Sequence, residues 1–252
     1  MSGPRRVTGT ASVVLAPNPG PMTLEGTNTW ILRAPDSQAC VVVDPGPEDE
    51  DHLATVASCG PVATILLTHG HYDHSEGARR LADLTRAPVR ALDPAHRLGD
   101  EGLADGDVIA AAGLEIRVAG TPGHTADSLS FVLGGPAGDS AVLTGDTILG
   151  RGTTVVAHPD GVLADYLVSL RRLRELGDVT VLPGHGPELP SAGVVAAQYL
   201  AHREQRLEQV RAAVAAGAGT AQEVVEIVYA DVDQVLWPAA TLSVLAQLEY
   251  LK

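Results

Sequence analysis

The chain has 252 residues, of which 45% are hydrophobic and only 3% aromatic, so a core can form but must consist mostly of Val, Leu, Ile and Ala. Its formal net charge of −14 opposes non-specific binding to nucleic acids, because like charges repel at long range. Two cysteines are too few for a disulfide framework, and no segment approaches the length of a transmembrane helix. We therefore expect a cytoplasmic protein that does not associate with membranes.

The first two thirds of the chain alternate short apolar runs with turns rich in glycine and proline, a pattern typical of β-strands. We predict strands at Ala11–Leu15, Thr29–Arg33, Ala39–Val43, Ala63–Thr68, Val89–Leu92, Leu114–Ala119, Ser128–Val132, Ala141–Thr144 and Thr180–Leu182. Helices are expected between some of them, at Glu48–Ser58, Ser75–Thr85 and Val162–Leu176. Strands with interleaved helices favour an α/β fold of packed sheets with helices on their outer faces.

The composition changes near Pro187–Pro190, and the remaining sequence is predicted to be almost entirely helical. The expected helices are Ala192–Ala216, Thr220–Tyr229 and Val235–Leu251. Thr220 is a candidate N-cap that forms a capping box with Glu223. We therefore predict a large domain over residues 1–190 and a small helical domain over 191–252.

Some polar or reactive side chains are expected to have no chemical role. Arg203, Arg206 and Arg211 lie along the predicted helix Ala192–Ala216 and are interpreted as a solvated face. Cys40 lies in an apolar, strand-like run and is predicted to be a small buried residue.

The most informative segment, from Thr68 to Ser75, reads Thr-His-Gly-His-Tyr-Asp-His-Ser and directly follows an apolar run. It brings His69, His71, Asp73 and His74 into six positions. Neutral imidazole and carboxylate are ligands that suit Zn(II) and its first-row neighbours. The spacing therefore predicts a metal site at the end of a strand.

Three further candidate ligands, His124, Asp146 and His185, each follow an apolar segment and a glycine. The alternative is that these residues are unrelated, solvated parts of loops. We favour a shared metal site, because the same ligand types recur in the same kind of local sequence.

With Asp44 in Val-Asp-Pro-Gly, the sequence resembles the metallo-β-lactamase-fold hydrolase superfamily, whose five motifs are present in order. This resemblance covers the whole first domain and implies a four-layer αββα sandwich with the metal site at one edge. It also implies a ligand set for two cations: His69, His71 and His124 for the first, Asp73, His74 and His185 for the second, and Asp146 as a bridge between them. Asp44 would orient a ligand or its loop by hydrogen bonding, and it also fits a simple Asp-Pro-Gly turn.

Two divalent cations about 3.5–4 Å apart can share one hydroxide, because each lowers the pKa of bound water. That hydroxide is a nucleophile at neutral pH, and the cations also polarise the carbonyl or phosphoryl oxygen that is attacked. Hydrolysis is therefore the expected reaction, with Asp73 holding the proton of the hydroxide. Two Zn(II) ions are the expected cofactor, and the same ligands accept Mn(II) or Fe(II).

A narrower resemblance comes from the run Asn18–Trp30, Asn-Pro-Gly-Pro-Met-Thr-Leu-Glu-Gly-Thr-Asn-Thr-Trp, and from His202–Arg206 in the helical tail. Both look like the β-lactamase-like protein 2 family, which pairs the hydrolase domain with a small winged-helix-like C-terminal domain. Its characterised animal members are similar to single-strand-specific endoribonucleases, and fungal relatives act as thioesterases on acyl carrier proteins.

Two features depart from the family pattern. Glu76 stands where a glycine or small residue is usual, and the chain stops at Leu251–Lys252, where a wing would be built.

Three functions stay open at this point. The first is a metal-dependent endoribonuclease that cleaves single-stranded RNA, as the family resemblance implies. The second is a hydrolase of a small ester or thioester, similar to glyoxalase II or an acyl thioesterase, which the negative charge favours. The third is a non-catalytic binding module that keeps the fold. The sequence is also compatible with a homo-oligomer.

Overall fold

The computed structural model describes residues 3–135, 140–156 and 158–252 and contains two β-sheets. The first sheet has six strands in the order β1-β2-β3-β4-β5-β6. Their bounds are Arg5–Arg6, Ala11–Leu15, Asn28–Leu32, Cys40–Val43, Val62–Leu66 and Val89–Arg90. The second sheet has five strands in the order β11-β10-β9-β8-β7. In chain order, β7 to β11 span Val108–Ala111, Leu114–Gly120, Leu129–Leu133, Ala141–Gly145 and Thr180–Pro183.

The two sheets pack face to face, because alternate residues of each strand are apolar on the inner side. Trp30 and Leu32 of β3 meet Ile116 of β8 and Phe131 of β9 in this central core. Ile31, which lies between Trp30 and Leu32, belongs instead to the core on the outer face of the first sheet. All four residues of β4 are buried, including Cys40 as predicted, since apolar layers cover both faces of this strand.

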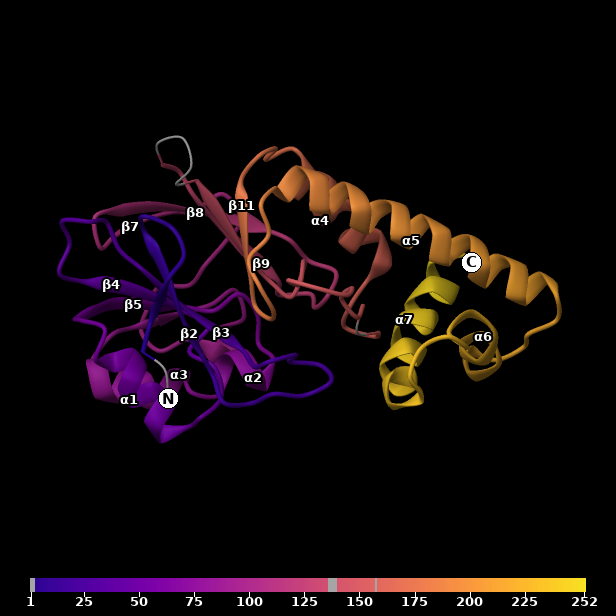
Figure 1. Cartoon of the computed structure of the whole chain (residues 1–252), viewed down its shortest axis with the longest axis horizontal. Coiled ribbons are helices and arrows are strands. Elements are labelled where there is room, and N and C mark those ends of the chain that lie inside the picture. The colour runs from indigo at the N-terminus through magenta and orange to yellow at the C-terminus, as the bar shows by residue number, and fades with distance from the viewer. Residues whose placement is uncertain (1–2, 136–139, 157) are drawn as a thin grey trace.

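Helices cover both outer faces, which completes the four-layer αββα sandwich (Figure 1). Helices α1 (Glu50–Ala57) and α3 (Ala78–Thr85) pack on the first sheet through Leu53, Val56 and Leu81. Helix α4 (Leu163–Arg174) and the first half of α5 (Ala192–Ala215) cover the second sheet. None of the described helices is both long and apolar enough to span a membrane.

Residues 191–252, all of which the structure describes, contain helices and no β-strand. Helix α6 (Ala221–Val228), a short 3-10 helix (Gln234–Leu236) and α7 (Trp237–Tyr250) follow α5. They form a separate apolar core with the second half of α5, at the end of the molecule away from α1 and α3 (Figure 1). The predicted capping box is confirmed, because Thr220 accepts from the Glu223 amide and the Glu223 carboxylate accepts from the Thr220 amide.

One helix differs from the prediction in a way that affects the metal-binding segment. The expected helix Ser75–Thr85 is replaced by two: α2 (Tyr72–Ser75) and α3 (Ala78–Thr85). Between them lies Gly77, whose amide donates to the carbonyl of Gly46. A Cβ atom on Gly77 would lie 2.9 Å from the carbonyl oxygen of Pro47, so glycine allows a close approach of the two backbones. Asp73 and His74 therefore lie in a short helix.

Candidate metal centre

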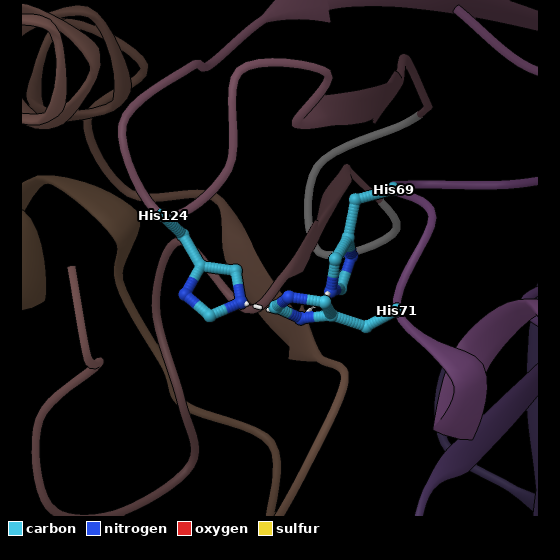
Figure 2. A group of neighbouring side chains, drawn as sticks. All are labelled: His69, His71 and His124. Atoms are coloured by element: carbon cyan, nitrogen blue, oxygen red, sulfur yellow. Dashed lines mark hydrogen bonds between the residues drawn. The ribbon is translucent and has the colours of Figure 1, made fainter. Parts of the chain in front are cut away.

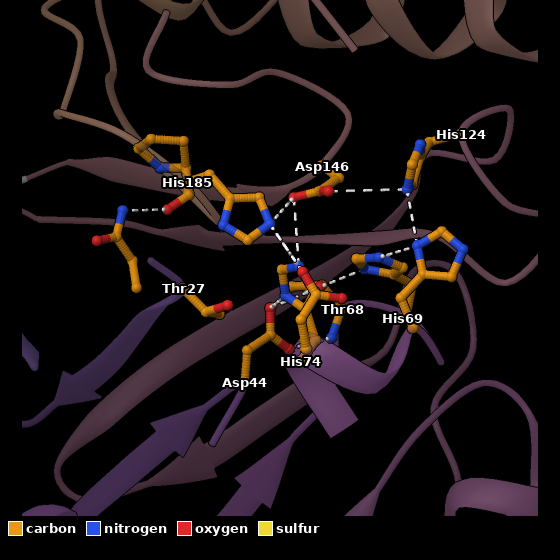
Figure 3. A network of polar contacts seen from close by, with 12 residues as sticks. Thr27, Asp44, Thr68, His69, His74, His124, Asp146 and His185 are labelled. Atoms are coloured by element: carbon orange, nitrogen blue, oxygen red, sulfur yellow. Dashed lines mark hydrogen bonds and ion pairs between the residues drawn. The ribbon is translucent and has the colours of Figure 1, made fainter. Parts of the chain in front are cut away.

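The candidate ligands all follow strands that end at one edge of the sandwich. Strands β4 and β5 are parallel, as are β10 and β11, so the carboxyl ends within each pair lie together. Strand β8 has the same direction as β10, since both are antiparallel to β9. The segments after β5, β8, β10 and β11 carry the predicted ligands, and the structure brings all seven together (Figure 3).

Three imidazoles form the first group, which contains His69, His71 and His124 (Figure 2). His71 Nδ1 lies 3.1 Å from His69 Nε2 and 3.0 Å from His124 Nε2. Zn–N bonds of about 2.0–2.1 Å at tetrahedral angles separate two ligand nitrogens by about 3.3 Å. The three nitrogens thus have nearly the spacing that one cation requires.

The second group contains Asp73, His74 and His185. His185 Nε2 lies 3.2 Å from His74 Nε2 and 3.1 Å from Asp73 Oδ2. Both histidines are buried, and the Asp73 side chain keeps about 29% of its surface exposed. Asp73 is therefore the member of this group that a water molecule or a substrate can reach.

Asp146 lies between the two groups. Its Oδ1 is 3.4 Å from His74 Nε2 and 3.5 Å from His185 Nε2, and its Oδ2 is 3.8 Å from His124 Nε2. Oδ1 is buried and has no hydrogen-bond partner among the described residues. A buried carboxylate oxygen without a hydrogen bond is costly unless a cation binds it. The residues present therefore fit divalent metal ions.

Hydrogen bonds orient the rings of the cluster through their other nitrogens. The carboxylate of Asp44 accepts from His74 Nδ1 at 2.9 Å, and from the amide and hydroxyl of Thr68. His124 Nδ1 lies 2.6 Å from the carbonyl oxygen of Val155, and His185 Nδ1 lies 3.2 Å from that of Gly26. Contacts of this kind fix the tautomer of a ligand histidine. Asp44 thus has the supporting contacts expected from the sequence, beyond those of a simple turn.

The electrostatics of the cluster divide the histidines into two kinds. Burial lowers the pKa of His69 well below its usual value, and burial also lowers the pKa of His124. Burial acts in the same direction on His185, but the carboxylates of Asp146 and Asp73 together outweigh it and raise the pKa of His185 to about 9. The charges of Asp146 and Asp44 likewise raise the pKa of His74. Excess negative charge therefore surrounds His74 and His185, as in a site that attracts cations.

A cavity of about 300 Å³ opens onto the cluster at His124 and Asp146. Part of its wall is apolar and includes Pro21, Met22, Leu24, Leu149, Val155 and Leu236. Helices α5 and α7 contribute another part of the wall, including His202, Arg203 and Ser243. The wall therefore combines residues that are far apart in the sequence.

The prediction of a solvated arginine face on the long helix is wrong for Arg203. This side chain is 2% exposed, and Arg206 is half-buried, whereas Arg211 is exposed as expected. The sequence contained a signal for the burial of Arg203, because this residue lies four positions from both Tyr199 and Leu207. That spacing places Arg203 on the apolar stripe of the helix. His52, which no pattern in the sequence marked, is fully buried in α1, where its Nε2 lies 2.9 Å from Thr29 Oγ1.

A family model described as the metallo-beta-lactamase superfamily matches residues 22–185, and the chain belongs to this superfamily. A second model, described as the beta-lactamase associated winged helix domain, matches residues 220–252. Both matches agree with the resemblance seen in the sequence. The second match shows the expected small C-terminal domain over residues 220–252.

Individual proteins show the same similarity. The chain is 32% identical to a beta-lactamase-like protein 2 homolog of Caenorhabditis elegans, over 78% of this chain and 68% of the relative. It is 31% identical to an atrochrysone carboxyl ACP thioesterase of Aspergillus fumigatus, over 86% of this chain and 72% of the relative. A crystal structure of a beta-lactamase domain protein from Burkholderia ambifaria superposes with a TM-score of 0.80 at 25% identity, covering 98% and 87% of the two chains.

Proposed function

We propose that the protein is a dinuclear metal-dependent hydrolase that cleaves a small thioester or ester. His69, His71 and His124 would hold one divalent cation, and Asp73, His74 and His185 a second, with Asp146 shared between them. Nitrogen and carboxylate ligands favour Zn(II) and also accept Mn(II) or Fe(II). The buried Oδ1 of Asp146, which has no hydrogen-bond partner among the described residues, supports the metal dependence.

Divalent cations at such a site supply activated water and polarise the carbonyl oxygen of the substrate. The protein itself orients the ligand side chains and supplies the proton acceptor. Asp73 is the exposed acid of the cluster, so its carboxylate can accept a proton from the attacking water. Asp44 keeps the His74 ring in one orientation and so preserves the geometry around Asp73.

The observation that carries the choice of substrate is the partly enclosed cavity of about 300 Å³ beside the cluster. Its apolar lining suits a short acyl group, because burial of apolar surface stabilises binding by about 25 cal/mol per Å². A polymer would need an open basic groove. Arg79 and Arg80 do not line the cavity, and Arg80 is paired with Glu50. The similarity to an acyl carrier protein thioesterase supports the same choice.

Cleavage of single-stranded RNA is the second candidate. The resemblance to the β-lactamase-like protein 2 family favours it, as do Arg151, Arg203 and Arg206 in the cavity wall. Two observations weaken it, because Arg151 is paired with Glu25, and the net charge of −14 repels a polyanion. Glu76, one of the two departures from the family pattern, accepts a hydrogen bond from the amide of Glu48 through its carboxylate.

The test compares substrates on one metal-loaded preparation of the full chain. We expect turnover of acyl thioesters that is abolished by a chelator and restored by Zn(II) or Mn(II), with a labelled single-stranded RNA left intact. Asp73→Asn should lower kcat on the order of a hundredfold or more. Asp83→Asn, the same change at an exposed position of α3, should have no effect.

Three outcomes would contradict the proposal in different ways. Metal-dependent cleavage of the RNA without thioester turnover would establish the second candidate. Stoichiometric metal without hydrolysis of any substrate would favour a binding module. Thioester turnover that is unchanged by chelation would remove the metal from the reaction.

A further inference from the structure

Three basic side chains from one turn of α5 line the cavity: His202, Arg203 and Arg206. Among the described residues, none of them has a carboxylate within ion-pair distance, although acidic residues outnumber lysine and arginine by 31 to 17 in the whole chain. Arg211, two turns further along the same helix, is paired with Glu208. The cluster at the cavity is thus a local excess of positive charge on an acidic protein.

Arg203 is the most deeply buried of the three, with 2% of its surface exposed. Its Nη2 donates to the carbonyl of Thr154, and its Cζ lies 5.0 Å from the centre of the Tyr166 ring. Its Nε is buried and has no hydrogen-bond partner in the described part of the chain. A buried charge without a counter-charge costs several kcal/mol, and a guanidinium has five N–H donors to satisfy. Arg203 therefore keeps an unused capacity to bind an anion.

The two neighbouring side chains add to this positive potential. The buried Nδ1 of His202 also has no hydrogen-bond partner among the described residues. Burial and the charges of Arg203 and Arg206 lower the pKa of His202, so its neutral ring can still donate or accept a hydrogen bond at neutral pH. Arg206 donates to the carbonyl of Val228 at 2.7 Å and lies over the Tyr229 ring, contacts that hold it between α5 and α6.

The position of this cluster defines which part of a substrate it can reach. The cavity meets the metal-binding residues at His124 and Asp146, and α5 supplies the basic side chains of the cluster. Figure 1 shows α5 running from the sandwich past α7 to the C-terminal helices. A substrate with its carbonyl at the metal-binding residues would direct another part of itself along the apolar lining toward Arg203.

We propose that His202, Arg203 and Arg206 form an anion subsite that selects substrates carrying a second, unreactive oxyanion. This inference rests on the proposed thioesterase function and narrows its substrate class. A carboxylate on the acyl group would supply the anion, and a phosphate on the thiol carrier would present the same chemistry. Bidentate hydrogen bonds from a guanidinium suit either group.

The first test uses the metal-loaded full chain and thioesters of the uncharged thiol N-acetylcysteamine. The glutaryl thioester, with a free carboxylate, should have a kcat/KM on the order of ten to a hundred times that of the pentanoyl thioester. Arg203→Gln should abolish this preference, because kcat/KM for the glutaryl thioester falls on the order of tenfold or more further than that for the pentanoyl thioester. Loss of a merely structural contact would lower both rates together. Arg211→Gln, the same change on the solvent side of α5, should behave as the wild type.

The coenzyme A thioesters of the same acids separate the two sources of the anion. A preference for coenzyme A whatever the acyl charge, lost in Arg203→Gln, would assign the subsite to a phosphate of the thiol carrier. Equal kcat/KM for all four thioesters in the wild type, with no preference for the glutaryl group or for coenzyme A, would overturn the proposal.

A binding measurement keeps the inference testable if Arg203→Gln does not fold or if no thioester is hydrolysed. Calorimetric titration of the wild type should show glutarate binding about tenfold more tightly than pentanoate, because only glutarate has a second carboxylate for the subsite. Selective binding of glutarate without any hydrolysis would contradict the proposed function and leave the subsite standing. Equal binding of the two acids would refute a subsite for the acyl carboxylate, independently of the reaction.

Discussion

His74 Nδ1 donates a hydrogen bond to Asp44 Oδ2 over 2.9 Å, and both side chains are almost fully buried. Because a carboxylate only accepts, this bond leaves Nε2 of a neutral His74 without a proton and directed at His185. The Asp44 carboxylate is itself fixed by the amide and hydroxyl of Thr68. The orientation of His74 thus depends on a residue that follows a different strand.

Asp44→Asn should weaken metal binding on the order of tenfold to a hundredfold, because the amide carries no charge to hold the Nδ1 proton. Competition with a chromophoric chelator gives the affinity directly. Asp36→Asn, the same change at an exposed position outside the site, is the control. An unchanged affinity in Asp44→Asn would show that His74 keeps its orientation without this hydrogen bond.

Gly184→Ala should lower both metal content and activity. A Cβ atom at this position would lie 2.6 Å from Asp146 Oδ1 and 2.7 Å from His74 Cε1, closer than real contacts allow. One of the two side chains must therefore move out of the cluster. Metal analysis of the purified variant measures the effect, and Gly134→Ala, where the added atom meets open space, serves as the control. A full metal complement in Gly184→Ala would contradict this close approach.

His52→Gln should change the pH dependence of stability. Burial lowers the pKa of His52 below its usual value of about 6.5, so the unfolded chain takes up a proton first as the pH falls. This contribution to stability is complete above about pH 6.5 and is lost progressively below it. Urea unfolding at about pH 7.5 and about pH 5.5 should show a smaller loss for the variant than for the wild type. Equal losses would mean that His52 is not held in its neutral form.

Thr220→Ala should destabilise the C-terminal helices by about 1 kcal/mol, because the first turn of α6 loses its N-cap. Thr55 offers a comparison, since its hydroxyl bonds to the carbonyl of Asp51 within α1 and caps no helix. Thermal unfolding of both variants measures the difference. A Thr220→Ala variant as stable as Thr55→Ala would show that the capping box contributes little.

Much of the sandwich could be predicted because its strands are short apolar runs between strong turn signals. The strand over Arg5–Arg6 was missed, since two exposed arginines carry no apolar pattern. Val108–Ala111 was missed because alanine is poor in the β-branched character that marks strands. The ligand cluster could be predicted because its residues lie in short local motifs. The division of the chain at residue 190 and the roles of the individual ligands stay predictions.

The cavity could not be predicted in the same way. It forms where the segment around Leu24, the loop at Thr154 and the helix residue Arg203 meet, and no local pattern encodes that meeting. The burial of Arg203 illustrates the difficulty. An arginine on an apolar helix stripe can extend its charged end into solvent or turn inward, and the choice depends on neighbours such as Tyr166.

The residues that line the cavity come from two separate parts of the chain, and this has an evolutionary consequence. His124 and Asp146, which follow strands, line one part of the cavity, and residues of α5 and α7 line another part. Substitutions on α5 or α7 can therefore alter the range of accepted molecules while the hydrolytic apparatus persists unchanged. Lineages with this architecture could acquire new specificities by remodelling a few helical positions, without passing through inactive intermediates.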